Sequence, residues 1–195
     1  MYFLRSVKNI LSQQALKAVY YSIVHSHFVY GIQIWSCTNL NNLSDLFLKQ
    51  KSAIRLINSA KYNAHTEPLF KSSGILPLYM LTDFFKMQFF HRFIINDLPI
   101  SFNHMWIRNE ARNHPDQPLL RNRQDFHIPH SRLTSTEKFP LTSYPRLWSS
   151  LNNDDIKNSI SKASFNINLK RFFLDKLNTD YSCTRLLCPH CHLLT

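Results

Sequence analysis

Apolar side chains recur every three to four residues along most of this chain, and this helical spacing limits the fold more than any other feature of the sequence. Residues 78–96 are apolar almost all the way round a helix, so we expect them to form a central buried helix. Pro99 ends that segment. Further helices are predicted over residues 16–35, 43–59, 67–71 and 162–177. The chain is therefore expected to be mainly α-helical.

Single residues set the ends and faces of these predicted helices. Thr66 precedes the shortest helix as an N-cap, and Gly74 follows it as a stop signal. Gly31 lies within the first apolar stripe and indicates a close crossing with another helix. In the second helix, Lys51 and Arg55 lie one turn apart, and we expect both cations to face solvent.

Regular periodicity breaks down over residues 100–151, which mix proline with arginine, histidine, serine and asparagine. This composition predicts a long irregular basic arm over the helices, with a short strand at residues 125–128. The arm is either a strap along a nucleic acid or a surface loop whose charges keep the chain soluble. In the first case the contacting side chains are Arg121, Arg123, His127, His130, Arg132 and Arg146.

The length and composition suit one small core. The chain has 195 residues, of which 44% are hydrophobic, and 15 phenylalanines supply much of the apolar material. We expect residues 1–99 to form a helical domain and residues 100–151 the arm. Residues 152–179 then form a C-terminal helical segment, and residues 180–195 a tail rich in Cys and His.

The formal charge of +11 is concentrated near the amino terminus. Residues 1–65 hold seven Lys and Arg against the single acid Asp45, a net charge of +6. A surplus of this kind is typical of a surface that binds a polyanion, although solvated faces and anionic membranes use basic surfaces too.

The sequence also indicates a compartment. The longest apolar-leaning run, residues 15–35, is interrupted by Lys17, Ser22, His25 and other polar residues and is too polar to cross a bilayer. No secretory signal pattern is present. Without one, the four cysteines favour reduced thiols or a metal site over disulfides. We expect a nuclear or cytoplasmic protein.

No catalytic constellation is visible in the sequence. The adjacent acids Asp154 and Asp155 follow two asparagines without a preceding apolar strand, which is typical of a helix start. Two glycines in the whole chain cannot build a phosphate-binding loop. His65 and His91 have no partner acid at a readable spacing. We therefore expect the chain to be non-catalytic by itself, with no catalytic cofactor.

The tail contains a cluster with metal-binding spacing. Cys183, Cys188 and Cys191 follow the pattern C-x4-C-x2-C, and the C-x2-C half is the chelating turn of zinc knuckles. His192 would complete a tetrahedral site, with His190 as its rival. The prediction is a terminal structural zinc knuckle. The alternative is a set of free thiols in a frayed end.

Aromatic residues of the first helical region have two interpretations. Tyr20, Tyr21, Tyr30 and Trp35 could stack on bases, or they could belong to the core, which is the commoner fate of aromatics at helical spacing. Tyr21 lies off the apolar stripe beside Lys17 and is the best candidate for an exposed ring.

A series of motifs in fixed order covers nearly the whole chain and resembles one family. The motifs are Tyr-Gly-Ile-Gln-Ile-Trp (30–35), Leu-Lys-Gln-Lys-Ser-Ala-Ile-Arg-Leu-Ile (48–57), His-Thr-Glu-Pro-Leu-Phe (65–70), Gly-Ile-Leu-Pro-Leu (74–78), Asn-Asp-Leu-Pro-Ile-Ser-Phe (96–102), Arg-Asn-Arg (121–123), Pro-Arg-Leu-Trp-Ser-Ser-Leu (145–151) and the segment from Ser-Phe to Phe-Leu (164–174). This series resembles the region after the polymerase palm in reverse transcriptases of LINE-type, non-LTR retrotransposons of the jockey-like kind. The family often ends in a Cys-x-Arg-Leu-x-Cys-Pro-x-Cys tail.

The resemblance implies a small, thumb-like helical bundle that holds primer–template by phosphate contacts with low sequence specificity. The Phe/Tyr-Ala-Asp-Asp segment that holds catalytic metals in such polymerases is absent, and the polymerase domain would lie upstream in a parent protein. The alternatives are a helical protein-interaction module, or a decayed element without a cellular role. The expected nucleic-acid-binding residues are Lys17, Tyr21, Lys49, Lys51, Arg55, Lys61, Arg121, Arg123, Arg132 and Arg146.

Overall fold

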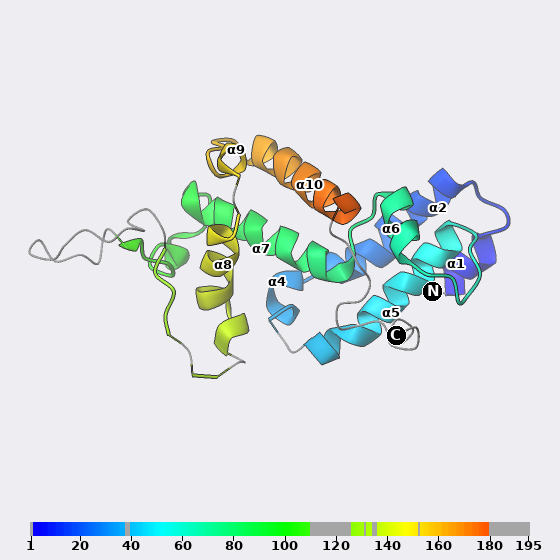
Figure 1. The fold of residues 1–195 in the computed structure, drawn as a ribbon, viewed down its shortest axis with the longest axis horizontal. Helices are drawn as coiled ribbons and strands as arrows, with labels where there is room; N and C mark the ends of the chain where they lie inside the picture. The colour runs from blue at the N-terminus through cyan, green and yellow to red at the C-terminus, as the bar shows by residue number, and fades with distance from the viewer. Residues whose placement is uncertain are drawn as a thin grey trace, which may run out of the picture. The chain divides into compact units, whose positions relative to one another are not determined.

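The computed structural model describes residues 2–37, 40–109, 126–130, 132–133, 136–151 and 153–179, without the side chains of residues 40–42. The chain divides into two compact units. Unit 1 holds the described residues of Met1–Thr82 and Arg171–Thr195, and unit 2 holds those of Asp83–Lys170. The regular structure of the described residues is helical, as predicted (Figure 1). In this part of the chain, no helix has both the length and the apolar character needed to cross a membrane.

Unit 1 begins with a series of short helices in place of the single helix predicted over residues 16–35. Ser12 starts the second of them, because its hydroxyl accepts a hydrogen bond from the Ala15 N–H at 3.3 Å. Tyr30 leaves the helical conformation with a ψ of 113°. The elements are α1 (Tyr2–Val7), α2 (Gln13–Val19), the π-helix η1 (Tyr20–His25), α3 (Ser26–Val29) and α4 (Ile32–Trp35).

Gly31 does not mark a close helix crossing, and this prediction is wrong. The residue is exposed, and a Cβ atom on it would meet the Trp35 ring carbon Cδ1 at an ordinary contact distance of 3.7 Å. Gly31 instead has a φ of 64° between α3 and α4. Because residues with a side chain rarely adopt this left-handed conformation, the glycine permits the turn that interrupts the helix.

The next two helices match their predictions closely. The segment 43–59 forms α5 (Leu40–Ile57), and the segment 67–71 forms α6 (Glu67–Ser73). Gly74 ends α6 with a φ of 63°, and its N–H donates to the Lys71 carbonyl at 3.2 Å. Thr66 takes the N-cap position without a side-chain hydrogen bond, and its carbonyl accepts the Phe70 N–H at 2.9 Å.

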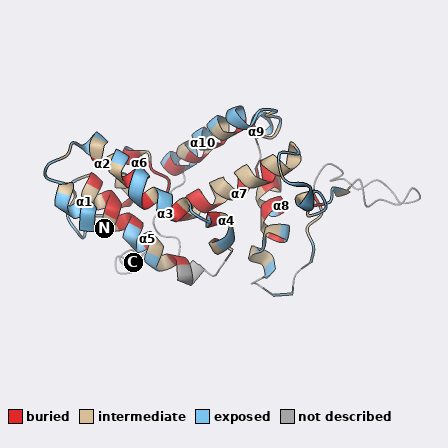
Figure 2. Cartoon of the chain, turned by 180° about the vertical axis from the view of Figure 1, so that it is seen from behind, coloured by how far each residue is buried: buried red, intermediate tan, exposed pale blue. Residues whose placement is uncertain are grey.

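The strongly apolar segment forms α7 (Leu78–Ile94), whose first residues belong to unit 1 and whose later residues lie at the centre of unit 2. The ring of Phe90 is fully buried there. Its centroid lies 5.1 Å from that of Trp106, 4.8 Å from that of Phe126 and 5.6 Å from that of Trp148. The contacts with Trp106 and Phe126 are edge-to-face and the contact with Trp148 is tilted, and because these rings bury large areas they form the core of unit 2. Buried residues recur along α7 in Figure 2.

A helix lies in the segment 100–151, for which no helix was predicted. This helix, α8 (Pro140–Ser149), starts with Pro140 at a position where a missing N–H costs little. Pro145 lies inside it, and the buried rings of Tyr144 and Trp148 lie four residues apart on one face. The prediction of an irregular arm is therefore wrong for these residues. Single 3-10 turns, η2 (Ile100–Phe102) and η4 (Thr136–Lys138), also occur in the segment.

The strand predicted at residues 125–128 is reduced to one antiparallel bridge in the residues that the structure describes. Arg108 pairs with Phe126, and the His127 N–H donates to the Ile107 carbonyl at 2.9 Å. Residue 125 lies outside the described part of the chain. The bridge fixes the Phe126 ring against the core of unit 2.

The predicted helix start at Asp154 and Asp155 is confirmed. These acids open α9 (Asp154–Lys157), and the Asn153 side-chain oxygen caps it by accepting the Ile156 N–H at 3.3 Å. Acids in the first turn also favour the positive end of the helix dipole. The pair therefore has a structural role.

The last helix, α10 (Lys162–Thr179), matches the prediction over residues 162–177. Its start is tied to the end of α7 by Asp97, which accepts hydrogen bonds from Arg92 Nε at 2.9 Å and from Lys162 Nζ at 3.2 Å. The Arg92 bond, with help from Lys162, lowers the pKa of the Asp97 carboxyl. The buried side chains of α10 are Phe165 and Leu169 in unit 2, and Phe173 and Leu177 in unit 1.

Candidate nucleic-acid interface

The cations of the first 65 residues differ in their exposure to solvent. Arg5 and Lys8, at α1, are exposed. Lys49 on α5 and Lys61 after it are exposed as well. Four of the seven Lys and Arg of this region are thus accessible to an anionic ligand.

Two further predicted phosphate contacts are half-buried and hold parts of unit 1 together. Lys17 donates from Nζ to the Ser73 carbonyl at 3.0 Å, which joins α2 to the last turn of α6. Arg55 donates from Nε to the Ala64 carbonyl at 2.8 Å and so fastens the loop after α5. These bonds hold both side chains partly inside unit 1, and the remaining N–H donors of each cation can still reach a phosphate.

Lys51 does not face solvent, and this prediction is wrong. Its residue is only 1% exposed, and its ammonium lies 4.6 Å from the centroid of the Phe47 ring. The spacing explains the burial, since Lys51 follows Phe47 by four residues and precedes the buried Ile54 by three. Lys49 is two residues away and therefore projects from the opposite side of α5.

In unit 2, two predicted contacts are exposed. Arg132 lies in the described pair 132–133, and Arg146 lies on the outer face of α8. His130 is exposed and His127 half-buried. Arg121 and Arg123 lie outside the described residues.

The aromatic residues of the first helical region divide between core and surface. Tyr20 is fully buried, whereas Tyr21 is 42% exposed, as the sequence suggested. Both belong to η1, and Tyr21 packs edge-on against His25 with ring centroids 5.1 Å apart. Tyr30 is 86% exposed, and its carbonyl accepts a hydrogen bond from Trp35 Nε1 at 2.9 Å. Tyr21 and Tyr30 are thus the two rings of this group most open to a ligand.

Gln50 is a structural residue whose role sequence reasoning missed. The side chain is completely buried. Its Nε2 donates to the Tyr20 hydroxyl and to the Leu76 carbonyl, each at 3.0 Å, and its Oε1 accepts the Leu78 N–H at 2.8 Å. It therefore joins η1, α5 and the start of α7. Burial raises the pKa of Tyr20 well above its usual range, and the bond from Gln50 opposes this shift.

His91 lies in the core of unit 2. The ring is buried and stacks on Phe165, with centroids 3.8 Å apart and planes 6° from parallel. Nε2 lies 2.8 Å from the Ser159 carbonyl, to which it donates, and Nδ1 has no hydrogen-bond partner. Burial lowers the pKa of His91, and the Ser159 bond only partly opposes this effect.

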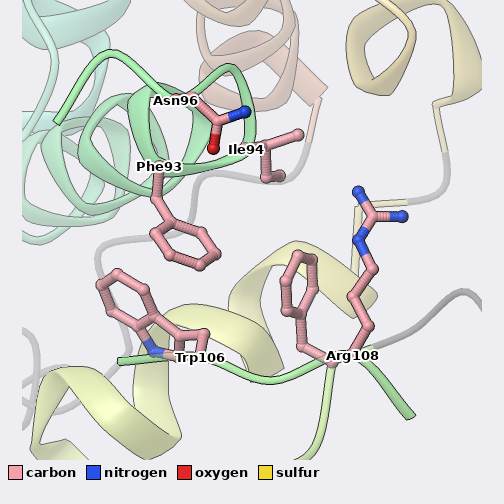
Figure 3. Close-up of a pocket in the computed structure, with 6 residues that line it drawn as sticks. Phe93, Ile94, Asn96, Trp106 and Arg108 are labelled. Carbon is pink, nitrogen blue, oxygen red and sulfur yellow. The ribbon is translucent and has the colours of Figure 1, made fainter. Parts of the chain in front are cut away.

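Unit 2 contains an open pocket that the sequence did not predict. Figure 3 shows Phe93 and Trp106 on one side of the opening, Arg108 on the other, and the Asn96 amide at the rim. The local sequence signal at this site is Asn96, which marks the end of a helix. Asparagine is favoured where a helix ends in the left-handed conformation, and Asn96 has a φ of 56°.

The described residues contain no group of three or more His, Cys, Asp and Glu that could hold a metal ion. The predicted ligands Cys183, Cys188, Cys191 and His192, with the rival His190, lie outside the described part of the chain. Cys37 donates from its thiol to the Gln33 carbonyl at 3.3 Å.

No protein-family model, no curated protein and no solved structure matches this chain. The family resemblance thus depends on the sequence motifs.

Proposed function

We propose that this chain is a non-catalytic nucleic-acid-binding fragment resembling the C-terminal part of a retrotransposon RNA-directed DNA polymerase. In this proposal it holds a primer–template duplex through phosphate contacts. The observation that carries the proposal is the surplus of exposed cations in unit 1, where four exposed Lys and Arg of the first 65 residues face a single acid, Asp45. Phosphate contacts fix register without reading sequence, so specificity is low.

The burial of individual side chains narrows the proposed contacts. Lys49 and Lys61 are the predicted cationic contacts that are exposed in unit 1. Arg5 and Lys8 join them, and Arg132 and Arg146 are the exposed contacts proposed in unit 2. Lys51 is no longer proposed as a phosphate contact, because it is buried. Tyr21 stays as a ring that can stack on a base or sugar.

Two further parts of the proposal concern the metal and the parent protein. Cys183, Cys188 and Cys191, with His192 or His190, would hold one structural zinc ion, because three thiolates and one imidazole suit its tetrahedral preference. Catalysis would belong to a polymerase domain upstream of this region in the parent protein, with its own metal-binding aspartates.

A helical protein-interaction module is the second candidate. Tyr30 and Ile34, on either side of the break between α3 and α4, are 86% and 81% exposed. Large apolar side chains this open to solvent suit a protein partner better than they suit phosphate. In that case the exposed cations of the first 65 residues would bind an acidic protein.

Binding to duplexes of unrelated sequence separates the two candidates. The proposed function predicts similar affinities for all duplexes. It also predicts a loss of about a hundredfold between 50 and 200 mM salt, if about four phosphates are contacted. Absence of binding at 50 mM salt, together with capture of an acidic polypeptide, would favour the interaction module.

Primer extension tests the non-catalytic part. We expect no extension with any primer, template or divalent metal, because no polymerase aspartate motif is present in the sequence. Extension above a mock preparation that disappears in the Asp155→Ala variant would contradict it.

A further inference from the structure

The pocket of unit 2 lies between the end of α7 and the bridge that pairs Arg108 with Phe126 (Figure 3). Its volume is about 290 Å³. Pockets for drug-sized ligands run from about 300 to 1,000 Å³, so this one suits a single planar ring system. The lining residues are Phe93, Ile94, Asn96, Trp106, Arg108 and Phe126.

Three aromatic rings form the apolar part of the pocket. The Phe93 centroid lies 4.9 Å from that of Trp106 and 6.0 Å from that of Phe126, with the planes inclined at 70° and 63°. Trp106 is buried, and its Nε1 donates to the Pro140 carbonyl at 3.1 Å. The bridge to Arg108 holds the Phe126 backbone. These contacts fix the rings before any ligand binds, which lowers the entropic cost of binding.

Two exposed polar side chains stand at the opening. Asn96 is held at a φ of 56° by hydrogen bonds on either side, from its own N–H to the Phe93 carbonyl at 3.1 Å and from the Asp97 N–H to the Arg92 carbonyl at 2.8 Å. The Arg108 guanidinium lies 5.3 Å from the centroid of the Phe126 ring. An amide that can both donate and accept thus faces the same opening as a cation.

We infer that this pocket receives one unstacked base of a single-stranded nucleic acid. The inference rests on the proposed function, to which it adds a second binding mode. The half-buried Phe93 ring packs against the base, the Asn96 amide hydrogen-bonds its edge, and Arg108 contacts the neighbouring phosphate. Unit 2 as a whole has twelve Lys and Arg against eight Asp and Glu, a net charge of +4, which favours an anionic strand over an uncharged peptide ring.

The test compares single-stranded 12-mers of equal charge. One carries thymine bases throughout, and the other is abasic at every position. We expect the base-bearing 12-mer to bind roughly tenfold more tightly, since phosphate contacts are common to both and base packing is not. A 12-mer with 5-iodouracil should form photochemical crosslinks within the peptides that carry Phe93 or Trp106.

Substitutions connect that difference to the pocket. Asn96→Gly removes the amide while allowing the same backbone conformation, so the advantage of the base-bearing strand should fall at least threefold. Arg108→Gln should weaken binding of this strand more than Lys170→Gln, which removes the same charge from an exposed position on α10. Unchanged far-ultraviolet dichroism and melting temperature would show that the fold is retained.

The outcomes separate this inference from the function on which it rests. Equal affinity for the two 12-mers, with duplex binding intact, would overturn the base pocket and leave the proposed function standing. Failure to bind any polynucleotide would overturn both. If N-acetylphenylalaninamide shifted the amide resonances of Asn96 and Arg108 while the two 12-mers bound equally, the pocket would take a peptide ring and the inference would be wrong.

Discussion

Replacing Gln50 with leucine removes the buried hydrogen-bond network of unit 1 with almost no change in side-chain volume. The Gln50 side chain makes three hydrogen bonds of 2.8 to 3.0 Å, and it is completely buried. Gln50→Leu leaves the Leu78 N–H and the Leu76 carbonyl without this partner, and it removes the donor to the Tyr20 hydroxyl. Each unsatisfied buried group costs about 1–3 kcal/mol, so we expect the free energy of unfolding to fall by about 3–5 kcal/mol.

Urea unfolding followed by far-ultraviolet dichroism measures this loss. Since small domains are stable by about 5–15 kcal/mol, the variant should unfold at a much lower urea concentration. Gln14→Leu is the matched control, because Gln14 is exposed on α2 and its replacement should change stability by about 0.5 kcal/mol or less. A loss below about 1 kcal/mol for Gln50→Leu would refute the account of Gln50 as the residue that joins η1, α5 and α7.

Lys51→Ala should lower the free energy of unfolding by about 2 kcal/mol or more, because packing and the contact with the Phe47 ring are lost. Lys49→Ala should change it by less than about 0.5 kcal/mol. Equal effects of the two substitutions in thermal melts would place both side chains in solvent. Because folding lowers the pKa of His91, the unfolded chain binds more protons than the folded chain below about pH 6.5. The free energy of unfolding should therefore fall as the pH drops from 7 to 5, and it should fall less steeply in His91→Phe. Parallel pH curves for the variant and the unmutated protein would contradict this account. Replacing Cys188 and Cys191 with serine should abolish zinc uptake and leave far-ultraviolet dichroism nearly unchanged. Sub-stoichiometric zinc in the unmutated, reduced protein would rule out the zinc knuckle.

Local patterns in the sequence predicted the helices with strong apolar periodicity. The segment 78–96 became α7 (Leu78–Ile94), because a helix that is apolar on nearly all sides is stable only when buried. Gly74 was recognised as a stop signal for the same kind of local reason, since its left-handed conformation disfavours other residues. The π-helix η1 and the break at Gly31 escaped prediction, because one continuous stripe of apolar residues runs through both.

Lys51 is buried because its spacing along α5 outweighs the usual exposure of a charged side chain. The interval of four residues from Phe47 already placed Lys51 on the inner face of α5. A long side chain can bury its methylene groups and keep its ammonium against an aromatic ring, so a lysine on an apolar stripe need not be exposed.

Other features depend on tertiary contacts that no local pattern contains. Two prolines within Pro140–Ser149 concealed α8, although Tyr144 and Trp148 have helical spacing. The partners of Gln50 lie 26 to 30 residues away in the sequence, at Leu76, Leu78 and Tyr20. The pocket of unit 2 likewise combines the end of α7 with the bridge at Phe126. A single sequence does not show which distant residues meet.

The salt dependence of duplex binding is the most direct test of the proposed function. Each phosphate contact contributes about 0.9 to the slope of log affinity against log salt concentration, so changing both Lys49 and Lys61 to glutamine should reduce the magnitude of the slope by about two. Changing Lys170 and Lys176 to glutamine removes the same charge from exposed positions on α10 and should leave the slope nearly unchanged. Equal slopes for the unmutated protein and the Lys49 and Lys61 variant would contradict the proposed interface.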